Sequence, residues 1–302
     1  MSNRIRIATR QSKLALWQAN FIRDQLLTAH ENLEVELVGM TTQGDRWLDS
    51  PLSEVGGKGL FVKELEAAML EDKADIAVHS MKDVPAILPE GFELPVIAFR
   101  DAVEDVLISR SGSLDELPQN ARVGSSSLRR QAQLLAIRPD LDVRPIRGNV
   151  DTRLQKLHDG DYDAIVLAQA GLNRLELSVD GTHILPVELS LPAPGQAALG
   201  IECHRDSPVR ELLMVLVDAD VERCVRAERA VSAGFGADCS LPIAAYARLD
   251  TDNIRLEALI ADASGERILK ASGEGSDPEL LGQEVVQQLY AAGAQSVLDS
   301  LD

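Results

Sequence analysis

Two short segments of the chain combine a tight turn with polar side chains and arginines. Val123-Gly-Ser-Ser-Ser-Leu-Arg-Arg130 runs from a strand through three serines into the expected start of a helix, and Arg147-Gly-Asn-Val-Asp-Thr-Arg153 repeats that order. A helix N-terminus offers unpaired N–H groups, and guanidinium groups bind carboxylates and phosphates. Turns at the carboxyl ends of neighbouring strands face one cleft. We therefore predict an anion-binding cleft, the alternative being that these arginines form ordinary surface ion pairs.

A third segment could supply a catalytic carboxylate. Asp75-Ile-Ala-Val-His-Ser-Met-Lys-Asp-Val-Pro85 places His79, Lys82 and Asp83 just after a short apolar strand. A carboxylate at a strand end can stabilise a developing cation or transfer a proton. For this motif alone, a turn or helix-cap aspartate is the simpler interpretation.

The cysteines fall into two groups. Cys203 lies in an apolar strand-like run and Cys224 in a helical pattern, so both are expected to be core residues. Cys239 lies in a Gly-rich loop, where functional side chains concentrate, and it is either a nucleophile, an attachment point or an unremarkable thiol. The odd count and the lack of C-x-x-C pairs argue against a disulfide framework, and the scattered histidines give metal catalysis no support.

Gly56-Gly-Lys-Gly-Leu-Phe61 resembles a phosphate loop only loosely, because Lys58 is followed by Gly59 rather than by Ser or Thr. ATP binding is therefore not expected. The glycines suit either a mobile loop or a plain turn before the helix expected from Leu60.

Overall charge limits the partners. The 302 residues carry a formal net charge of −18, which disfavours nucleic acid and anionic membrane. Between Arg122 and Lys156, however, eight bases face three acids, so this stretch is +5. Such a local excess can hold a small anion, because contact pairs are screened far less than distant charges. The N-terminal residues contain no signal-peptide pattern and no window is apolar enough to span a bilayer, so we expect a cytoplasmic protein.

The expected elements place these side chains at strand ends. Strands near Ile5, Leu33 and Ile76 alternate with helices over 14–27 and 60–71, which favours βαβ units and a mostly parallel sheet. The alternation is interrupted at residues 88–107 and 191–196, and a second set of alternating strands and helices lies between these two segments. The acidic C-terminal part of the chain is predicted to form a helix, three strands and a last helix.

Taken together, the motifs resemble the hydroxymethylbilane synthase (porphobilinogen deaminase) family. The resemblance follows the family's order over nearly the whole chain and is weaker in the final third. The segments that carry it, besides those quoted above, are Arg6-Ile-Ala-Thr-Arg-Gln-Ser12, Ser126-Ser-Leu-Arg-Arg-Gln131, Pro194-Gly-Gln196, Ala227-Glu-Arg-Ala230 and Asp238-Cys-Ser-Leu-Pro-Ile-Ala244.

The resemblance implies an α/β fold: two domains like type II periplasmic binding proteins joined by two crossings, and a smaller C-terminal α+β domain with a three-stranded sheet. The expected boundaries are 1–98 plus 195–216, 99–194, and 217–302. It further implies a monomeric transferase of tetrapyrrole and heme biosynthesis. This enzyme would join four porphobilinogen molecules head to tail with loss of ammonia, then release hydroxymethylbilane by hydrolysis.

The same resemblance implies roles for single residues. A dipyrromethane cofactor would be bound to Cys239 by a thioether, Asp83 would be catalytic, Gln196 would lie near the hinge, and no metal would be needed. Gly56, Gly57, Lys58, Gly59 and Phe61 would belong to a mobile loop over the cleft. The carboxylates of cofactor and substrate would be held by Arg10, Ser12, Lys82, Ser127, Arg129, Arg130, Arg147, Arg153 and Arg174.

The chain departs from the family's usual residues at three places. Ala102-Val-Glu-Asp105 stands where Asp-Pro-Arg-Asp is common, Ala197 stands where Gly is usual, and Asp238 and Ser240 flank the cysteine where Gly and Gln often occur. None removes a residue of the implied mechanism. The competing hypothesis is a carboxylate-binding protein of the same two-domain fold without catalysis.

Overall fold

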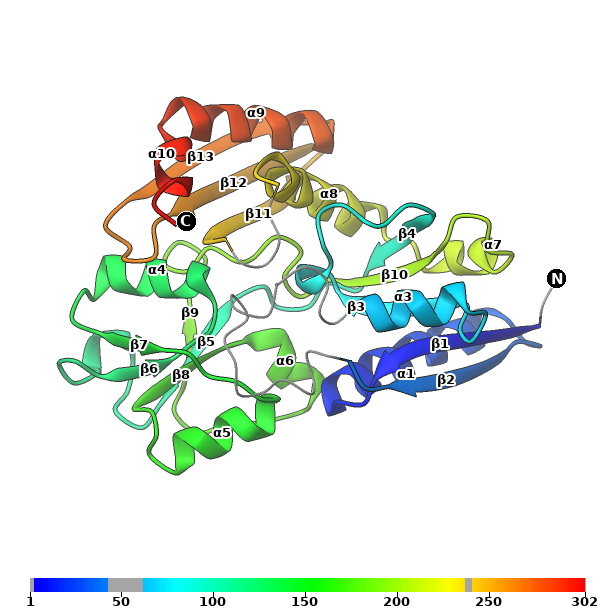
Figure 1. The fold of residues 1–302 in the computed structure, drawn as a ribbon, viewed down its shortest axis with the longest axis horizontal. Helices are drawn as coiled ribbons and strands as arrows, with labels where there is room; N and C mark the ends of the chain where they lie inside the picture. Colours follow the sequence, from blue (N-terminus) through cyan, green and yellow to red (C-terminus); the bar gives the residue numbers. More distant parts are fainter. Residues whose placement is uncertain (1–2, 43–61, 237–240, 302) are drawn as a thin grey trace.

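The computed structural model describes residues 3–42, 62–236 and 241–301, and these form three lobes, each with its own sheet (Figure 1). Two lobes are five-stranded α/β units, and the third, towards the C-terminus, is a three-stranded sheet covered by helices. The predicted fold class is therefore confirmed. Within the described ranges, no helix is both long and apolar enough to cross a bilayer.

The first sheet has the strand order β2-β1-β3-β10-β4. Its strands are β1 (Arg4–Arg10), β2 (Glu34–Met40), β3 (Ile76–Ser80), β4 (Phe92–Ala98) and β10 (Leu199–His204). β1 is parallel to β2 and β3, whereas β10 is antiparallel to both β3 and β4. The prediction of a mostly parallel sheet is confirmed, because four of its five strands, β1 to β4, run in one direction. The fifth, β10, comes from much later in the chain and returns antiparallel between β3 and β4.

Helices cover both faces of this sheet because its strands are apolar on both sides. Ile5 and Ile7 pack with α1 (Lys13–Ala29), whereas Ala8 and Ala77 pack with α3 (Lys63–Leu70). α7 (Arg210–Leu213) and the short 3₁₀ turn η3 (Met214–Leu216) add Leu213 and Leu216 to the α1 side.

The second sheet repeats this plan with the order β7-β6-β8-β5-β9. Its strands are β5 (Asp105–Ser109), β6 (Arg122–Gly124), β7 (Asp142–Arg144), β8 (Ala164–Ala168) and β9 (Thr182–Leu185). β6 is parallel to β7 and β8, and β5 is antiparallel to β8 and β9. η2 (Leu114–Glu116) and α4 (Leu128–Ile137) pack on one face, and α5 (Val150–His158) and α6 (Gln169–Arg174) on the other.

The third sheet is the antiparallel order β11-β12-β13, with bounds Ile243–Asp250, Asn253–Ala261 and Ile268–Gly275. Its core is shared with α8 (Ala219–Gly234), α9 (Pro278–Ala291) and α10 (Ala294–Leu298). Cys224 is buried in this core and Cys203 in that of the first sheet. Burial raises the pKa of these thiols to about 11 and about 12. Their predicted role as core residues is confirmed.

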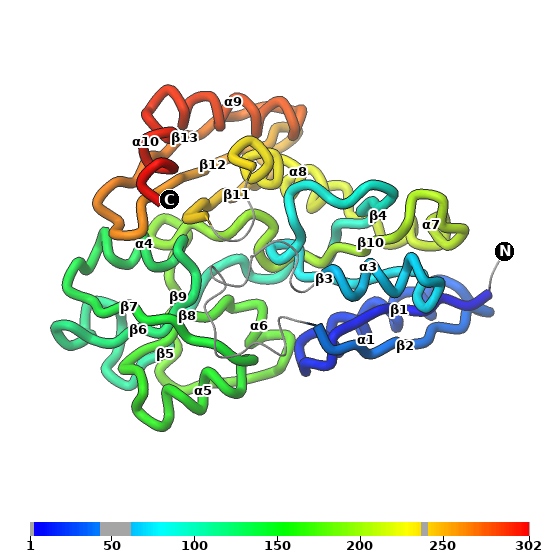
Figure 2. Tube along the Cα trace, in the orientation of Figure 1, coloured from blue at the N-terminus to red at the C-terminus, as the bar shows by residue number. Residues whose placement is uncertain are grey.

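Two chain crossings connect the first two lobes, one between β4 and β5 and one between β9 and β10 (Figure 2). Each contains a non-glycine residue with left-handed backbone, Phe99 (φ 54°) and Ala197 (φ 71°). Such conformations cost roughly 1 kcal/mol or more and persist only where the surroundings enforce them. Ala197, noted above as a departure from glycine, therefore adds backbone strain to the second crossing.

Candidate functional site

A cleft of about 670 Å³ lies between the first two lobes, bordered by the third. Parallel strands bring their carboxyl ends to one edge of a sheet. β1 and β3 thus present Arg10 and the turn containing Asp83, while β6 and β7 present the Ser125–Ser127 turn and Arg147. The prediction that both arginine-rich turns face one cleft is confirmed.

Asp83 ends η1 (Met81–Asp83), the 3₁₀ turn that directly follows β3. The turn is fixed from several sides, since Met81 N donates to Ala198 O at 3.0 Å and Val84 N donates to Met81 O at 3.2 Å. Gln18 of α1 also donates from Nε2 to Ser80 Oγ at 2.8 Å. Asp83 is therefore held at the cleft on a short, well-anchored turn rather than on a long loop.

The first arginine-rich turn has its own buried counter-ion. Asp105 is fully buried at the start of β5 and accepts from Arg129 Nη2 at 2.8 Å and Arg130 Nη2 at 2.7 Å. Ser190 Oγ donates to the same carboxylate at 2.9 Å. Burial alone would raise the pKa of Asp105, but the two guanidinium groups outweigh it and hold the pKa well below its usual value. Both arginines line the cleft while remaining tied to the second lobe.

The second arginine-rich turn carries no such counter-ion. Arg153 Nε donates to the carbonyl of Gly148 at 2.9 Å, and across residues 3–42, 62–236 and 241–301 no carboxylate forms an ion pair with Arg147 or Arg153. Burial lowers the pKa of Arg153 to about 10 and also lowers that of Arg147. Burial likewise lowers the pKa of Lys82 to about 8, with Arg130 as the next cause. For Arg147 and Arg153, which have no carboxylate partner among the described residues, partial desolvation is costly, and a bound anion offsets that cost.

The remaining predicted binding residues lie at the same cleft in different ways. Ser12 and Ser127 line it and also cap helices, since Ser12 Oγ accepts from Ala15 N and Ser127 Oγ from Arg130 N. Arg10 lies at the end of β1. Arg174 is buried beside both crossings: its Nη2 donates to the carbonyls of Ala197 and Phe99, and its guanidinium lies 5.7 Å from the Trp17 ring centroid.

Gln196 joins the two crossings. Its Nε2 donates to Val103 O at 2.6 Å and to Asp105 Oδ1 at 3.0 Å, so the second crossing is bonded to the first. The hinge role predicted for it stays a prediction, but the side chain lies where the two crossings meet.

Sequence reasoning missed two buried carboxylates that lie at the chain crossings. In the sequence, Asp105 is noted only within Ala102-Val-Glu-Asp105, although a carboxylate that opens an apolar strand is itself a signal of a buried ion pair. Glu228 of α8 is fully buried and accepts from Arg100, Gly195 N and Ala247 N, which ties the third lobe to both crossings. Its place between Ala227 and Arg229 in a helix gave no hint of burial.

The cleft residues fit a carboxylate-bearing pyrrole group such as dipyrromethane. Unpaired guanidinium groups suit acid side chains, and Asp83 lies close enough to Lys82 and Arg153 to affect their charge. Cys239 and the predicted mobile-loop residues 56–61 lie outside the described residues. Ser232, Leu241 and Ile243, which precede and follow that cysteine in the chain, line the cleft. Among the described residues, no group of histidine, cysteine and acidic side chains could hold a metal ion.

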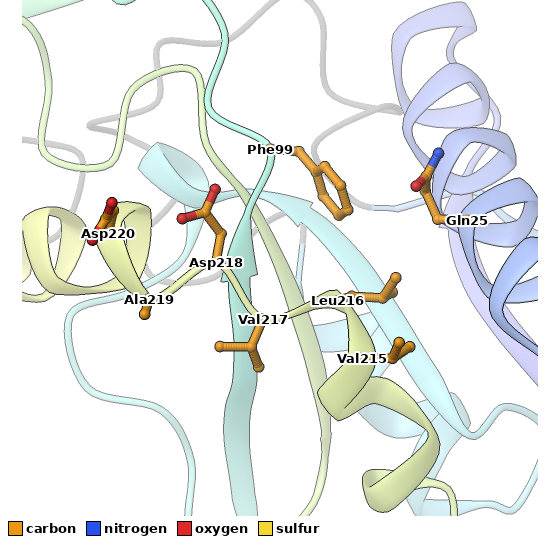
Figure 3. A pocket seen from close by; sticks show the side chains of 8 residues that line it. All are labelled: Gln25, Phe99, Val215, Leu216, Val217, Asp218, Ala219 and Asp220. Carbon is orange, nitrogen blue, oxygen red and sulfur yellow. The ribbon is translucent and has the colours of Figure 1, made fainter.

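A second hollow, of about 480 Å³, has different chemistry (Figure 3). Asp218 and Asp220 lie on one side of it and Gln25 of α1 on the other, with Phe99 between them. None of the described residues that line it is a lysine or arginine, and Asp218 Oδ1 accepts from Val221 N as the cap of α8. It does not suit an anionic substrate.

Comparisons with known proteins agree with this site. The family model described as "porphobilinogen deaminase, dipyromethane cofactor binding domain" matches residues 5–211. The model described as "porphobilinogen deaminase, C-terminal domain" matches residues 222–291. A porphobilinogen deaminase of Acidithiobacillus ferrooxidans is 50% identical over 303 residues, covering 100% of this chain and 99% of that one. That of Nitrosomonas europaea is 49% identical over 302 residues, covering 99% and 98%.

Solved structures give more distant likenesses. The OxyR2 regulatory domain from Vibrio vulnificus has a TM-score of 0.44 at 14% identity and covers 72% of this chain and 94% of that one. The aliphatic sulphonate binding protein SsuA from Escherichia coli has a TM-score of 0.41 at 13% identity and covers 78% and 71%. The two family descriptions and the full-length relatives establish that this chain belongs to the porphobilinogen deaminase family.

Proposed function

We propose that this chain is a transferase that deaminates porphobilinogen and joins four such units head to tail on a dipyrromethane group bound to Cys239, then releases hydroxymethylbilane by hydrolysis. Family membership supports the reaction. The observation that carries the proposal is the placement of Asp83 in a cleft whose cations Arg147 and Arg153 have no carboxylate partner among the described residues.

Asp83 is the proposed catalytic residue. Joining two pyrrole units forms one C–C bond and breaks two bonds, the aminomethyl C–N bond of one unit and the α C–H bond of the other. The amino group and that proton leave as ammonia, and positive charge develops at pyrrole nitrogens on the way. A carboxylate fixed beside those nitrogens stabilises that charge without needing a metal. The dipyrromethane group, when bound, supplies the pyrrole carbon to which the first unit is joined. The anchored turn after β3 keeps the Asp83 carboxylate in place for each addition.

The cations orient the reactants. Guanidinium groups bind acetate and propionate side chains in bidentate fashion, so they fix the orientation of a ring as well as its position. We assign this role to Arg147 and Arg153, which have no carboxylate partner among the described residues, and to Arg129 and Arg130 as cations fixed by Asp105. Arg10, Ser12, Lys82, Ser127 and Arg174 complete the proposed set, with Arg174 also bonded to the crossings.

The division into 1–98 plus 195–216, 99–194 and 217–302 is part of the proposal. It is supported by β10 lying in the first sheet although it follows β9 of the second. The bonds of Gln196 to Val103 and Asp105 support a hinge at the paired crossings. A monomer in the cytoplasm, with residues 56–61 as a mobile loop, rests on the family resemblance alone.

Intact-mass spectrometry combined with turnover tests the proposal. The purified wild type is expected to be heavier than its sequence by one dipyrromethane, and Cys239→Ala is expected to lose that excess together with activity. Asp83→Asn is expected to keep the added mass and the fold while kcat falls by a factor of about 100 or more. An unmodified chain that binds carboxylates without turnover would instead support the non-catalytic binding protein.

A further inference from the structure

A cluster of three titratable side chains is buried on the α3 side of the first sheet, outside the cleft. His79 of β3, Glu202 of β10 and Glu66 of α3 are only 6%, 0% and 8% exposed. His79 Nε2 lies 2.7 Å from Glu202 Oε2, and Nε2 is the donor because a carboxylate oxygen accepts. Ala77 and Glu202 face each other in the antiparallel pairing, so the next residue on that face, His79, reaches the same carboxylate diagonally.

The second oxygen of Glu202 identifies the third member of the cluster. Glu202 Oε1 is buried and has no hydrogen-bond partner among the described residues. The carboxyl group of Glu66 lies within hydrogen-bonding reach of Glu202. Two buried carboxylates in contact cannot both be ionised at reasonable cost, and a proton between them satisfies the unpaired oxygen. Burial, with the charge of Glu202 as the next cause, raises the pKa of Glu66 to about 7.

The other charged groups around Glu66 and Glu202 do not cancel the rise in the pKa of Glu66. His79 and Lys63 act to lower the pKa of Glu66, from β3 and from its own helix, yet the net change is upward. On the other side, Arg229 of α8 is close enough to Glu202 to interact with its charge. The Arg229 guanidinium donates hydrogen bonds to the backbone carbonyls of Val84, Pro85 and Ala86 at 2.8 to 3.2 Å. It therefore does not form an ion pair with Glu66 or Glu202.

The His79–Glu202 contact lies just before the turn that carries Asp83, and the contacts of Arg229 lie just after it. His79 precedes it by four residues on β3, and the carbonyls held by Arg229 follow it immediately. A change in the charge of the cluster thus acts directly on the β3 end of this segment, through His79, and reaches the Ala86 end only through the charge interaction of Glu202 with Arg229.

We infer that Glu66 is a positioning residue for Asp83: as a neutral acid it donates its proton to Glu202 Oε1 and completes a buried chain, Glu66–Glu202–His79, that fixes the end of β3. The inference rests on the proposed role of Asp83 for its effect on turnover, but not for the existence of the shared proton. Glu66 touches neither substrate nor cofactor in this account.

The pH dependence follows from the direction of the shift. The folded-state pKa of Glu66, about 7, lies above its unfolded value of 4.5, so the folded protein holds the proton more tightly. The resulting stabilisation is complete below the unfolded value and is lost as pH rises through about 7. Above that pH, two adjacent buried negative charges loosen the end of β3.

Glu66→Gln tests this directly, because the amide mimics the neutral acid and can donate to Glu202 Oε1 at every pH. We expect the wild-type Tm to fall by at least ~3 °C between about pH 6 and about pH 8, and kcat to fall over the same range. Glu66→Gln should lose both declines with its KM unchanged. Glu71→Gln, at the exposed end of the same helix, should retain both.

Infrared spectroscopy of the wild type supplies a second measurement that needs neither activity nor a folded variant. A protonated carboxylic acid C=O band should be present at about pH 6 and diminish at about pH 8. Absence of that band below pH 7, or Tm and kcat profiles in Glu66→Gln identical to wild type, would overturn the inference. If Asp83 proves dispensable while the band and the Tm profile behave as expected, the proposed catalytic role fails and the shared proton stands.

Discussion

The two arginine-rich turns look equivalent in the sequence, but the structure gives them different electrostatic settings. Arg129 and Arg130 are bound to the fully buried Asp105, whereas Arg147 and Arg153 have no carboxylate partner in the described part of the chain. The one carboxylate within the second turn, Asp151, lies 2.7 Å from Lys13 of the first lobe instead. An arginine that is paired with a carboxylate of its own chain is held in place within the fold. An arginine in the cleft without such a partner is available to bind an anion.

This difference matters in a protein with a net charge of −18, where acidic partners are abundant. In the described part of the chain, Arg147 and Arg153 nevertheless have no carboxylate partner. The first turn therefore has a structural role besides the binding role proposed for it. The binding role proposed for the second turn rests on two arginines that have no carboxylate partner among the described residues.

Asp105→Ala should produce the largest effect. It leaves two buried guanidinium groups without a counter-ion, and removing one partner of a buried ion pair costs about 3–5 kcal/mol. The Tm should fall by several degrees and cofactor occupancy, measured by intact mass, should fall with it. Asp163→Ala, which breaks the half-exposed pair with Arg122, is the matched control and should cost much less. Equal losses for the two variants would show that Asp105 is not the anchor of the first turn.

Arg147→Gln should act on binding without acting on stability. Loss of one charged hydrogen bond to a substrate carboxylate costs about 1.5–3 kcal/mol, so KM should rise by roughly tenfold or more while the Tm stays within about 1 °C. Arg144→Gln removes a nearby exposed arginine that is paired with Asp142 and lies outside the cleft lining, and its KM should be unchanged. A similar KM increase in both variants would point to general electrostatic attraction rather than a specific contact.

The Lys13–Asp151 contact should contribute least. Its side chains are 73% and 43% exposed, and such pairs contribute well under ~1 kcal/mol. Lys13→Gln should lower the Tm slightly at low salt and not at all at high salt, because exposed pairs are screened. A large, salt-independent loss would mean that this contact, which joins the first two lobes, is a substantial link between them.

The sequence was sufficient to predict the alternating strands and helices and the meeting of three polar turns at one cleft. Those predictions rest on local signals: apolar runs, capping residues such as Ser127 and Asn149, and the rule that parallel strands end at one edge. The position of β10 between β3 and β4 could not be read locally, because strand pairing between distant segments leaves no local pattern.

Buried polar residues were the main omission. Glu66 occupies the first turn of a helix, where acidic residues are common and usually exposed, so its burial near Glu202 and His79 was invisible in the sequence. Glu228 was missed for a similar reason, since burial of a carboxylate depends on which distant arginine meets it. Asp105 differs, because its position at the start of an apolar strand was a local signal. Likewise, no residue type predicts the left-handed backbone at Phe99.

The most direct test of the account compares Tm and substrate affinity in Arg130→Gln and Arg153→Gln, measured together on the cofactor-loaded enzyme. Arg130→Gln should lower both quantities, because Asp105 loses a partner and the cleft loses a cation. Arg153→Gln should lower affinity for porphobilinogen by roughly tenfold or more and leave the Tm unchanged or slightly raised. If Arg153→Gln lowers the Tm as much as Arg130→Gln does and leaves affinity intact, the distinction between the two turns is wrong.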